Sequence, residues 1–359
     1  MLPDRMHAVL LTRHGDLGAL EYRGDISVPV PGTGEVLVRV TAAALNNTDV
    51  NLRIGWYSRA SAPAASDAEP GTAGSVEDGS WSGTPVAFPL IQGTDACGQI
   101  VAVGPGVATG RVGERVLIDP VLRADAADPT SSVRYLGCDC NGEFAEFVAV
   151  PAANAFPVRA KPLSDAELAS FPCAYMTAEN LLTRAQISAT DTLLVSGASG
   201  GVGSAAVQLA RRRGARVLAI ASAGKEPALK SLGADEVAGR GEDLVERFGV
   251  ESVDAVIDVV GGATFGPLLQ VLKRGGRYAV AGAISGAQVR LDLRTLYLKD
   301  LTLHGCTVPP PQLFERLVGY IERGEIRPVV AKIFRLCELA AAQQAFLDKA
   351  YVGKIVVLP

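Results

Sequence analysis

The pattern of apolar and polar positions differs between the two halves of the chain. In the second half, residues 192–196, 216–221, 253–258 and 277–281 are short apolar runs with helix-like segments between them. Residues 233–237 lead into one more short strand. Strands that are apolar along their whole length and alternate with helices are typical of a parallel sheet covered on both faces. The second half therefore predicts a doubly wound α/β sheet.

The first part of the chain has a shorter period. Residues 36–42 alternate apolar and polar side chains, as a half-buried strand does. A turn rich in glycine and proline, residues 29–35, precedes this run. Short strands between such turn signals predict an irregular β domain. The other strands expected here are residues 6–11, 20–28, 100–103, 112–118 and 143–150.

Helical spacing is also present in the linking and C-terminal segments. Residues 165–184 have the spacing of a helix, with a break near Pro172. Beyond Pro309 the pattern predicts two helix–strand pairs. Their expected positions are a helix at 312–323, a strand at 329–335, a helix at 338–349 and a strand at 354–358.

The segment TLLVSGASGGVG, residues 192–203, is a glycine-rich turn between a predicted strand and a predicted helix. That context is required for a dinucleotide-binding fingerprint G-x-G-x-x-G, whose key positions are Ala198, Gly200 and Gly203. Gly200 lets the backbone approach a pyrophosphate, and Gly203 lets the helix pack close to the strand. Gly201 and Val202 complete the turn and open the helix, whose N-terminus attracts phosphate.

The residues after the second strand of this sheet indicate which dinucleotide binds. An acidic residue about 20 positions past the glycines holds the ribose 2′-hydroxyl of NAD. Ser222 occupies that position here, and Lys225 follows closely. A missing carboxylate and a nearby cation favour a 2′-phosphate, so we expect NADP(H). The alternative is that Lys225 is an exposed charge that opens a helix.

Composition limits the expected class of protein. A length of 359 residues is typical of about two domains. The net charge is −4 without a long basic run, so neither nucleic acid nor a membrane is an expected partner. The first residues lack the apolar core of a signal peptide, and we expect a cytoplasmic protein. Six cysteines in so long a chain predict buried free thiols.

Four stretches of the sequence resemble a known family. They are PVPGTGEVLVRV, ALNNTDVNLRIGWY, FPLIQGTDACGQIVAVG and VGERVL. They are similar to the N-terminal catalytic domain of the medium-chain dehydrogenase/reductase superfamily. The glycine-rich turn and the C-terminal ending GKIVVLP resemble other parts of proteins of the same superfamily. The resemblance covers nearly the whole chain. It implies a Rossmann domain, residues 158–305, inserted into a GroES-like, mostly β catalytic domain formed by residues 1–157 and 306–359.

The resemblance also assigns positions around the nicotinamide. Thr177 in the linking helix would lie near the ring, and Cys173 near the metal position of zinc-dependent members. The loop formed by Gly282, Ala283 and Ile284 would lie under the ring, at the carboxyl end of the sheet. Residues 288–293 are predicted to be an exposed strand, which implies the edge of a homodimer. Residues 301–307 are predicted to be the last strand of the sheet.

The zinc-ligand positions of the family are altered in this chain. By resemblance they fall at Asn46, Thr94 and Cys173. Asparagine and threonine are poor zinc ligands, and one cysteine does not hold a catalytic metal. The structural zinc site of the family needs four close cysteines, whereas residues 133–147 contain Cys138 and Cys140. We therefore expect no metal at either site.

These departures place the chain nearer the zinc-independent members, which resemble quinone oxidoreductases and 2-enoyl reductases. Residues 46–57 are similar to the segment of mitochondrial-type enoyl thioester reductases that carries a proton-donating tyrosine, which implies this role for Tyr57. A tyrosine hydroxyl can hydrogen-bond an enolate oxygen or supply a proton to the α carbon. The alternative is that Trp56 and Tyr57 pack beside the active site. Asn46 and Thr94 are the other polar groups expected to face the substrate.

Residues 58–84 form an unusual stretch, rich in alanine, serine, glycine and acidic residues and without a visible period. A structureless loop of this length is uncommon in a compact domain and is usually functional or disordered. Both a lid over the active site and a surface excursion fit this composition.

The leading functional hypothesis is an NADPH-dependent, zinc-independent oxidoreductase. Its small-molecule substrate would be an α,β-unsaturated carbonyl compound, an enoyl thioester or a quinone. A metal-free carbonyl or alcohol oxidoreductase would use the same residues. A nucleotide-binding protein of low redox activity and a reductase of specialised-metabolite biosynthesis are the remaining alternatives.

Overall fold

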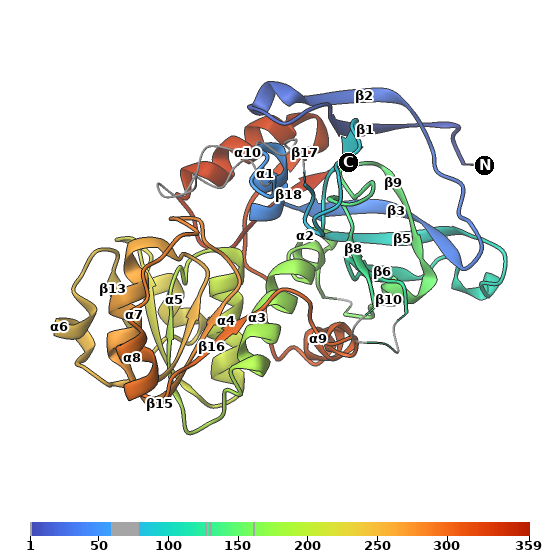
Figure 1. The fold of residues 1–359 in the computed structure, drawn as a ribbon. Coiled ribbons are helices and arrows are strands. Elements are labelled where there is room, and N and C mark those ends of the chain that lie inside the picture. The colour runs from blue at the N-terminus through green and yellow to red at the C-terminus, as the bar shows by residue number, and fades with distance from the viewer. Residues whose placement is uncertain (1, 59–78, 126–127, 129–130, 161) are drawn as a thin grey trace. The chain divides into compact units, whose positions relative to one another are not determined.

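The computed structural model describes residues 2–58, 79–125, 128, 131–160 and 162–359. The chain divides into two compact units (Figure 1). The first unit contains Met1–Cys173, Val330–Ala350 and Lys354–Pro359, and the second contains Ala174–Val329 and Tyr351–Gly353. The first boundary lies later than the predicted 157/158 because the helix Asp165–Ala169 packs on strands of the first unit. The second lies later than the predicted 305/306 because residues 306–329 pack within the second unit.

The second unit contains a six-stranded parallel sheet in the order β13-β12-β11-β14-β15-β16. The strand order reverses between β11 and β14, and such a switch point is where open α/β sheets bind ligands. The doubly wound parallel sheet is therefore confirmed. The strands are β11 (Thr192–Val195), β12 (Arg216–Ala221), β13 (Glu236–Gly239), β14 (Val253–Asp258), β15 (Leu272–Val280) and β16 (Thr302–Gly305).

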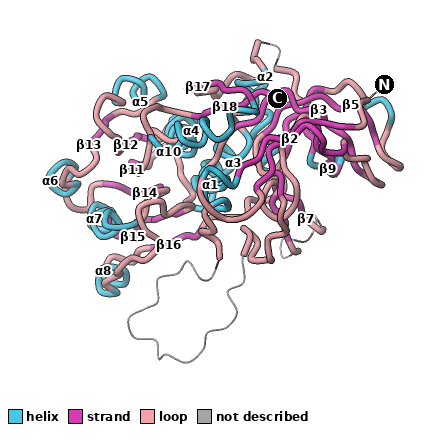
Figure 2. The backbone as a smooth tube through the Cα atoms, turned by 90° about the horizontal axis from the view of Figure 1, so that it is seen from above, coloured by secondary structure: helices cyan, strands magenta, loops and turns pink. Residues whose placement is uncertain are grey.

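Helices cover both faces of this sheet. In Figure 2, α4 and α5 lie on one side of the row of strands, and α6, α7 and α8 lie on the other. The apolar strand residues meet helix residues in one core, in which Leu194, Val256 and Leu268 are fully buried. The helices are α3 (Pro172–Arg184), α4 (Gly201–Arg212), α5 (Glu226–Leu232), α6 (Leu244–Phe248), α7 (Phe265–Val271), α8 (Leu293–Leu298) and α9 (Leu313–Glu322).

Residues 288–293 do not form the predicted strand. The segment is a loop that ends in α8, a helix that the sequence analysis missed. Asp292 caps this helix, since its carboxylate accepts a hydrogen bond from the backbone N–H of Arg294 at 2.9 Å. The alternating pattern of these residues was misleading because an N-cap aspartate stops a strand and starts a helix.

The first unit is built around β3 (Glu35–Ala44), which pairs with β5, β9 and β18 in a seven-stranded sheet. A three-stranded sheet has the order β2-β1-β4, and β7 pairs with β8. The other strands are β1 (Arg5–Leu11), β2 (Leu20–Ser27), β4 (Leu90–Ile91), β5 (Ala96–Val103), β6 (Arg115–Ile118), β7 (Val121–Arg123), β8 (Val133–Tyr135), β9 (Phe147–Pro151), β10 (Ala155–Pro157), β17 (Val330–Arg335) and β18 (Lys354–Leu358).

Three short helices complete the first unit. They are α1 (Asn47–Arg53), α2 (Asp165–Ala169) and α10 (Leu339–Asp348). Single 3-10 turns of the first unit lie at Leu17–Ala19, Thr109–Arg111, Ala152–Asn154 and Leu336–Glu338, and the second unit has one at Gly262–Thr264. Among the residues described, no helix is long and apolar enough to cross a membrane.

Strand β9 starts later than residues 143–150 predicted. The backbone N–H groups of Glu143 and Phe144 donate to the carbonyl oxygens of Gly93 and Gln92, at 3.3 and 2.8 Å. This irregular pairing holds the Glu143 segment against the Gly93 turn. It brings both segments to the candidate site described below.

Candidate functional site

The glycine-rich turn of the second unit joins β11 to α4. Its left-handed residue is Gly197, with φ +68°. Ala198 follows with a negative φ, and its N–H donates to the carbonyl oxygen of Ile220 at 3.1 Å. Because the conformation that requires glycine falls on Gly197, alanine is accepted at the first position of the fingerprint.

The other two fingerprint glycines have different structural reasons. A Cβ on Gly203 would lie 2.2 Å from the carbonyl oxygen of Gly197, so the close approach of α4 to the turn requires glycine there. A Cβ on Gly200 would meet a single atom, Gly197 O, at 3.6 Å. Gly200 is the N-cap of α4, and Gly201 and Val202 form its first turn. The open backbone before a helix N-terminus fits a pyrophosphate.

A basic corner lies beside this turn, at the end of β12. Ser222 directly follows that strand, and the ammonium group of Lys225 donates to the Ser199 hydroxyl at 3.3 Å. Arg240 directly follows β13, and its N–H donates to Ala221 O at 2.9 Å. Burial, and then repulsion by Arg240, lowers the pKa of Lys225. Sequence reasoning missed Arg240, because the pairing of β12 with β13 is a long-range contact.

Loops at the carboxyl ends of β14 and β15 lie next to each other. The N–H of Ser285 donates to Val260 O at 2.9 Å, and a Cβ on Gly282 would lie 3.0 Å from Val259 O. The predicted loop residues Ala283 and Ile284 belong to this pair of loops. Strand ends of this kind are where a parallel sheet binds its ligand.

Thr177 is a partly exposed residue of α3. Helix α3 is tied to α4, because the side-chain amide of Gln208 donates to the Tyr175 hydroxyl at 2.8 Å. The Tyr175 hydroxyl in turn donates to Arg327 O at 2.6 Å. The helix that carries Thr177 is thus fixed to the helix that opens at the glycine-rich turn.

In the first unit, α1 carries most of the predicted catalytic segment. Its buried residues include Asp49, Val50 and Leu52, while Asn47, Thr48 and Asn51 are partly exposed. The exposed face of α1 is therefore polar. The side-chain amide of Asn47 donates to Asn51 Oδ1 at 3.0 Å, and the amide of Asn51 donates to the Tyr57 hydroxyl at 3.5 Å.

The start of α1 is closed by its own capping contact, and its end is held by contacts outside the helix. At its start, the N–H of Asn46 donates to Asp49 Oδ2 at 2.7 Å. At its end, the Arg53 guanidinium donates to Gln343 Oε1 at 2.8 Å and to Gly15 O at 2.7 Å. The polar face of α1 is consequently a fixed feature of the first unit.

A buried cation lies behind this face. The ammonium group of Lys354 donates to Leu45 O at 2.7 Å, to Asn46 Oδ1 at 2.5 Å and to Asp95 Oδ2 at 2.7 Å. An ammonium group only donates, so it fixes the oxygen of the Asn46 amide toward itself. Sequence reasoning placed Lys354 in the last strand without a role, although a lysine before the apolar run IVVL was a usable signal.

The predicted residues Asn46 and Thr94 meet in this network. The Asn46 amide nitrogen donates to the Thr94 hydroxyl at 2.9 Å and to Asp95 Oδ2 at 2.8 Å. Thr94 has no exposed surface, and Asn46 is 7% exposed. The N–H groups of Asn46 are thus directed inward, and Thr94 lies behind Asn46.

Cys173 and two aromatic residues extend the same cluster. The N–H of Cys173 donates to Asp95 Oδ1 at 2.5 Å, and the Tyr135 hydroxyl donates to Cys173 Sγ at 3.3 Å. Burial raises the pKa of Cys173 to about 12. Burial, and then the Cys138 thiol, raises the pKa of Tyr57, while hydrogen bonds with Asn51 and Thr48 act in the opposite direction. Tyr57 therefore keeps its proton at neutral pH.

Two further carboxyl groups are buried near Asp95. Burial raises the pKa of Asp49 to about 7, and burial followed by Asp95 and Asp49 raises that of Glu143 well above its usual range. Neither carboxyl oxygen of Glu143 has a hydrogen-bond partner among the described residues. Protonation of these groups lets a pocket with one ammonium group tolerate three carboxyl groups.

The donor set around Asn46 does not fit a zinc ion. An amide, a hydroxyl and a protonated thiol are poor ligands, and the Lys354 ammonium already binds Asn46 and Asp95. Within the described residues, no group of three histidine, cysteine, aspartate or glutamate side chains is arranged to hold a metal ion. Of the six cysteines, Cys97, Cys138, Cys173 and Cys306 are buried free thiols, Cys140 is half-buried and Cys337 is exposed.

The predicted insertion, residues 58–84, lies largely outside the described residues. Its last part is described and is attached to the site. Trp81 stacks on Tyr135 with ring centroids 4.7 Å apart. The Ser82 hydroxyl donates to Asp139 Oδ1 at 2.7 Å, and the N–H of Tyr135 donates to Asp139 Oδ2 at 2.6 Å. Asp139 thus links the end of the insertion to Tyr135.

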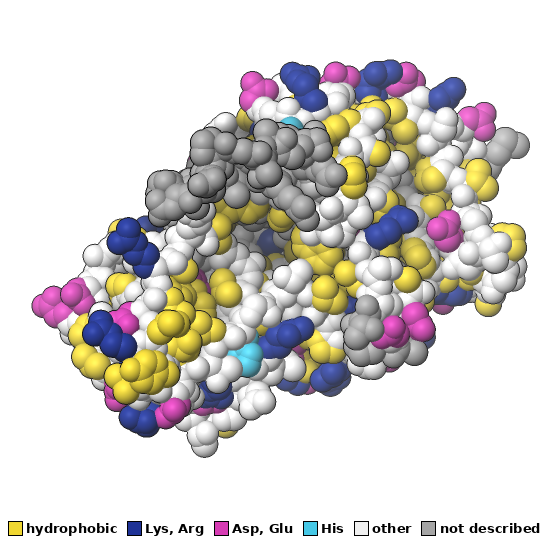
Figure 3. Space-filling model, in the orientation of Figure 1, with side chains coloured by type: hydrophobic (Ala, Val, Ile, Leu, Met, Phe, Trp, Pro, Cys, Tyr) yellow, Lys and Arg dark blue, Asp and Glu magenta, His cyan; other side chains and the backbone are white. Residues whose placement is uncertain are grey.

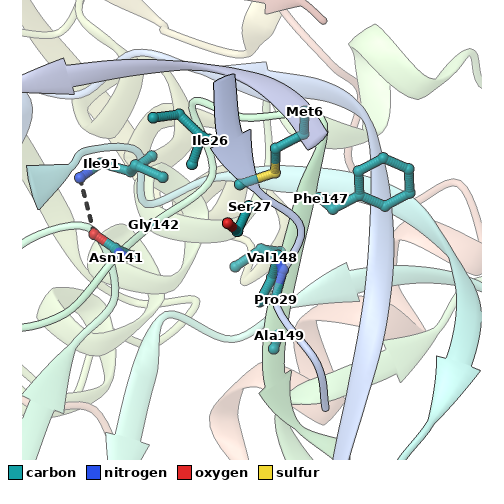
Figure 4. Close-up of a pocket in the computed structure, with 10 residues that line it drawn as sticks. All are labelled: Met6, Ile26, Ser27, Pro29, Ile91, Asn141, Gly142, Phe147, Val148 and Ala149. Atoms are coloured by element: carbon teal, nitrogen blue, oxygen red, sulfur yellow. Dashed lines mark hydrogen bonds between the residues drawn. The ribbon is translucent and has the colours of Figure 1, made fainter. Parts of the chain in front are cut away.

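A separate pocket in the first unit does not include the predicted residues. Figure 4 shows apolar side chains around it and one polar contact, in which the N–H of Ile91 donates to Asn141 Oδ1 at 3.0 Å. It is lined by Met6, Ile26, Ser27, Pro29, Ile91, Asn141, Gly142, Phe147, Val148 and Ala149. None of these side chains is an acid or base, so the pocket is not a candidate catalytic site.

Comparison with known proteins agrees with both units. The family models for the alcohol dehydrogenase GroES-like domain and for the zinc-binding dehydrogenase match residues 32–160 and 201–323. A solved structure from Sinorhizobium meliloti 1021, whose name calls it an alcohol dehydrogenase, is 47% identical to this chain and superposes with a TM-score of 0.88. The match covers 100% of this chain and 98% of that one.

Two curated relatives are similar over nearly their whole length. The chain is 29% identical to acryloyl-coenzyme A reductase of Metallosphaera sedula, over 98% of this chain and 99% of that protein. It is also 29% identical to an NAD-dependent alcohol dehydrogenase of Saccharolobus solfataricus, over 99% of this chain and 100% of that protein. The two names describe different reactions, and the second also names NAD as the cofactor.

Proposed function

The chain belongs to the medium-chain dehydrogenase/reductase superfamily of oxidoreductases, and from that premise we propose that it uses NADPH to reduce an activated carbon–carbon double bond without a bound metal. The substrate is an α,β-unsaturated carbonyl compound or an enoyl thioester, which is reduced at its double bond, or a quinone, which accepts the hydride in its place. The similarity to acryloyl-coenzyme A reductase supports an activated alkene. The similarity to an alcohol dehydrogenase makes carbonyl reduction the principal rival.

The observation that carries this proposal is the hydrogen-bond network around Asn46. The oxygen of the Asn46 amide accepts a hydrogen bond from the Lys354 ammonium group, and its nitrogen donates to the Asp95 carboxylate. The side chains gathered here are unsuited to bind zinc. A metal-dependent alcohol dehydrogenase polarises its carbonyl oxygen with the metal. A chain without that group needs another polar group at the substrate, and Tyr57, in the turn after α1, supplies a proton donor.

The chemistry needs one hydride and one proton. The dinucleotide, when bound, supplies the hydride. Addition of hydride to the β carbon shifts the alkene electron pair, and an enolate forms. Tyr57 donates its phenolic proton to the α carbon, a new C–H bond forms, and the carbonyl group is restored. The phenolate left on Tyr57 then takes a proton from water, so that one hydride and one proton are consumed per double bond.

The remaining predicted residues act through their neighbours. Asn46 and Thr94 maintain the buried network, since the Asn46 amide donates to the Thr94 hydroxyl at 2.9 Å. Because Thr94 is fully buried, we propose that it holds Asn46 in position and does not contact the substrate.

The basic corner at the end of β12 supports NADPH as the cofactor. Lys225 and Arg240 supply two positive charges near Ser222, where an NAD enzyme carries a carboxylate. A 2′-phosphate would accept charge-assisted hydrogen bonds from such groups. The glycine turn and α4 bind the pyrophosphate, and Thr177, Gly282, Ala283 and Ile284 surround the nicotinamide in this proposal.

A homodimer is the proposed assembly. Strand β16 ends the row of strands and pairs with β15 on one side. The loop and helix before it expose apolar side chains, and Leu293 and Tyr297 are 64% and 62% exposed. Figure 3 shows hydrophobic side chains, in yellow, gathered in the region where α8 lies in Figure 1. A second copy would pair with the free edge of β16 and cover the patch.

A pair of titrations tests the proposed function. Purified protein is titrated with NADPH and with NADH, and its metal content is measured on the same sample. Tight NADPH binding, weaker NADH binding and less than stoichiometric zinc are expected. One equivalent of zinc would identify a metal-dependent alcohol dehydrogenase. Failure to bind either nucleotide would contradict the proposal that the protein is an oxidoreductase.

A further inference from the structure

The polar face of α1 forms a directed chain of hydrogen bonds. Asn47 and Asn51 lie four residues apart, and the amide nitrogen of Asn47 donates to Asn51 Oδ1 at 3.0 Å. The amide nitrogen of Asn51 faces the Tyr57 oxygen at 3.5 Å. The spacing of Asn47 and Asn51 places both on one side of α1, and Tyr57 meets Asn51 from the turn after the helix.

The two ends of the Asn51 amide have different roles in this chain. Its oxygen accepts the hydrogen bond from Asn47, which leaves its NH2 group to face Tyr57. An amide NH2 group donates and does not accept. The Tyr57 oxygen is therefore an acceptor in this contact, and its own proton is directed away from Asn51. The Thr48 hydroxyl also hydrogen-bonds Tyr57 and, like the Asn51 amide, lowers the pKa of the phenol.

Asn51 also determines where the Tyr57 backbone runs. The N–H of Trp56 donates to the main-chain oxygen of Asn51 at 2.8 Å. Gly55 has φ +72°, a left-handed conformation that lets the chain turn back after α1. The same residue thus holds the backbone before Tyr57 and the hydroxyl of its side chain.

We propose that Asn51 is a positioning residue that turns the hydroxyl proton of Tyr57 toward the substrate and stabilises the phenolate after proton transfer. This inference rests on the proposed function, since it requires Tyr57 to be the proton donor. A hydrogen bond donated to the phenolate favours the charged form. Asn47 fixes the direction of the chain, because its donor group holds the oxygen of Asn51.

Reversing the polarity of the chain tests this role without changing side-chain size. In Asn51→Asp the carboxylate only accepts, so the Tyr57 proton turns toward it and kcat falls about ten- to hundredfold near neutral pH. As pH falls and the introduced carboxyl group takes up a proton, it donates again and kcat recovers. Cys138 and Cys173, the thiols near Tyr57, stay protonated in this range because burial raises the pKa of each. Asp49 of the same helix, whose pKa burial raises to about 7, titrates in both proteins, so the recovery is measured relative to the wild-type pH profile.

A second variant reverses the direction of the hydrogen bonds between residue 47, Asn51 and Tyr57 without replacing Asn51. In Asn47→Asp the carboxylate cannot donate to Asn51 Oδ1, so the Asn51 amide rotates and presents its oxygen to Tyr57. We expect a fall in kcat with little change in KM or in the dissociation constant of NADPH measured by protein fluorescence. Asn141→Asp, an exposed change of the same kind, is the control for the added charge.

The assays use whichever of crotonaldehyde, methyl vinyl ketone, crotonyl-coenzyme A and benzoquinone the wild-type protein reduces with NADPH. Wild-type kcat and an unchanged pH profile in both aspartate variants, with a large loss in Tyr57→Phe, would overturn the role of Asn51 and leave the proposed function intact. Wild-type kcat in Tyr57→Phe would overturn the proton-donor role itself. An equal loss in Asn141→Asp would assign the effect to charge and also overturn the inference.

Discussion

The ammonium nitrogen of Lys354 lies 2.7 Å from a carboxylate oxygen of Asp95, and the two side chains are 4% and 0% exposed. The pair joins β18 at the end of the chain to the Gly93–Asp95 turn, about 260 residues earlier. Asn46 contacts both partners, so the pair determines how the residues at the altered zinc-ligand positions are arranged. This arrangement supports the proposal that the chain works without a bound metal.

Removing the ammonium group should destabilise the first unit strongly. In Lys354→Met the carboxylate of Asp95 is left buried without its counter-charge, which costs about 3–5 kcal/mol. The free energy of unfolding is measured by urea denaturation near neutral pH. The double variant Lys354→Met/Asp95→Asn should recover much of the loss, because it removes the unpaired charge.

Lys273→Met is the matched control for this change. Lys273 pairs with Asp254 at 2.8 Å, but the two side chains are 43% and 24% exposed. An exposed pair of this kind contributes less than about 1 kcal/mol. Equal losses in Lys354→Met and Lys273→Met would show that burial of the Lys354 pair has no special weight.

The buried acid Asp49 should make stability depend on pH. Burial raises its pKa in the folded protein to about 7, compared with about 3.9 for an unfolded chain. Between these values the folded state holds the proton and the unfolded state has lost it, so this group lowers stability progressively as pH rises from about 4 to about 7.

Asp49→Asn removes this dependence and keeps an oxygen that can accept the Asn46 N–H. The variant should match the wild type in stability near pH 4 and exceed it above about pH 7, by an amount on the order of 4 kcal/mol. The measurement is urea denaturation of both proteins across this range. A difference between them that is independent of pH would contradict the assignment.

Replacing either cation of the basic corner should change cofactor preference. Lys225→Ala and Arg240→Ala should each weaken NADPH binding about tenfold to hundredfold, because each removes a charge-assisted hydrogen bond to the 2′-phosphate. NADH binding should change little. Lys230→Ala on the same helix is the control, since Lys230 pairs with Glu226 at 2.8 Å. Equal losses for the two nucleotides would refute the 2′-phosphate assignment.

Charging the apolar patch should prevent the proposed dimer. Tyr297→Glu introduces a carboxylate into a surface that the second copy would bury, without touching the core. Sedimentation velocity of the wild type should report twice the chain mass, and the variant should report the chain mass. A wild-type protein that sediments as a monomer would reject the dimer.

Periodicity predicted the second unit well because its strands are buried on both faces. Continuous apolar runs such as residues 216–221 leave little choice of structure, and this strand was predicted with its exact bounds. The strand predicted at residues 288–293 was wrong for the opposite reason. All of these residues except the partly buried Leu291 are exposed, so their alternation reflects no buried sheet face, and the N-cap role of Asp292 decided the local structure.

The candidate site was predictable only in part. Motif resemblance identified Asn46 and Thr94, and the structure brings them into contact at 2.9 Å. Lys354 and Arg240 were missed because their partners are distant in sequence and are brought near by strand pairing. The proton direction at Tyr57 depends on the orientation of the Asn51 amide, which no sequence pattern encodes.

If hydride is transferred to a carbon–carbon double bond, the transferred atom must be found on the former alkene carbon of the product. Chelator-treated protein is incubated with NADPH that carries deuterium at the transferable position and with methyl vinyl ketone, and the product is examined by NMR. We predict the saturated ketone with deuterium on its β carbon. Deuterium on the carbinol carbon of an unsaturated alcohol would contradict the account and identify a carbonyl reductase.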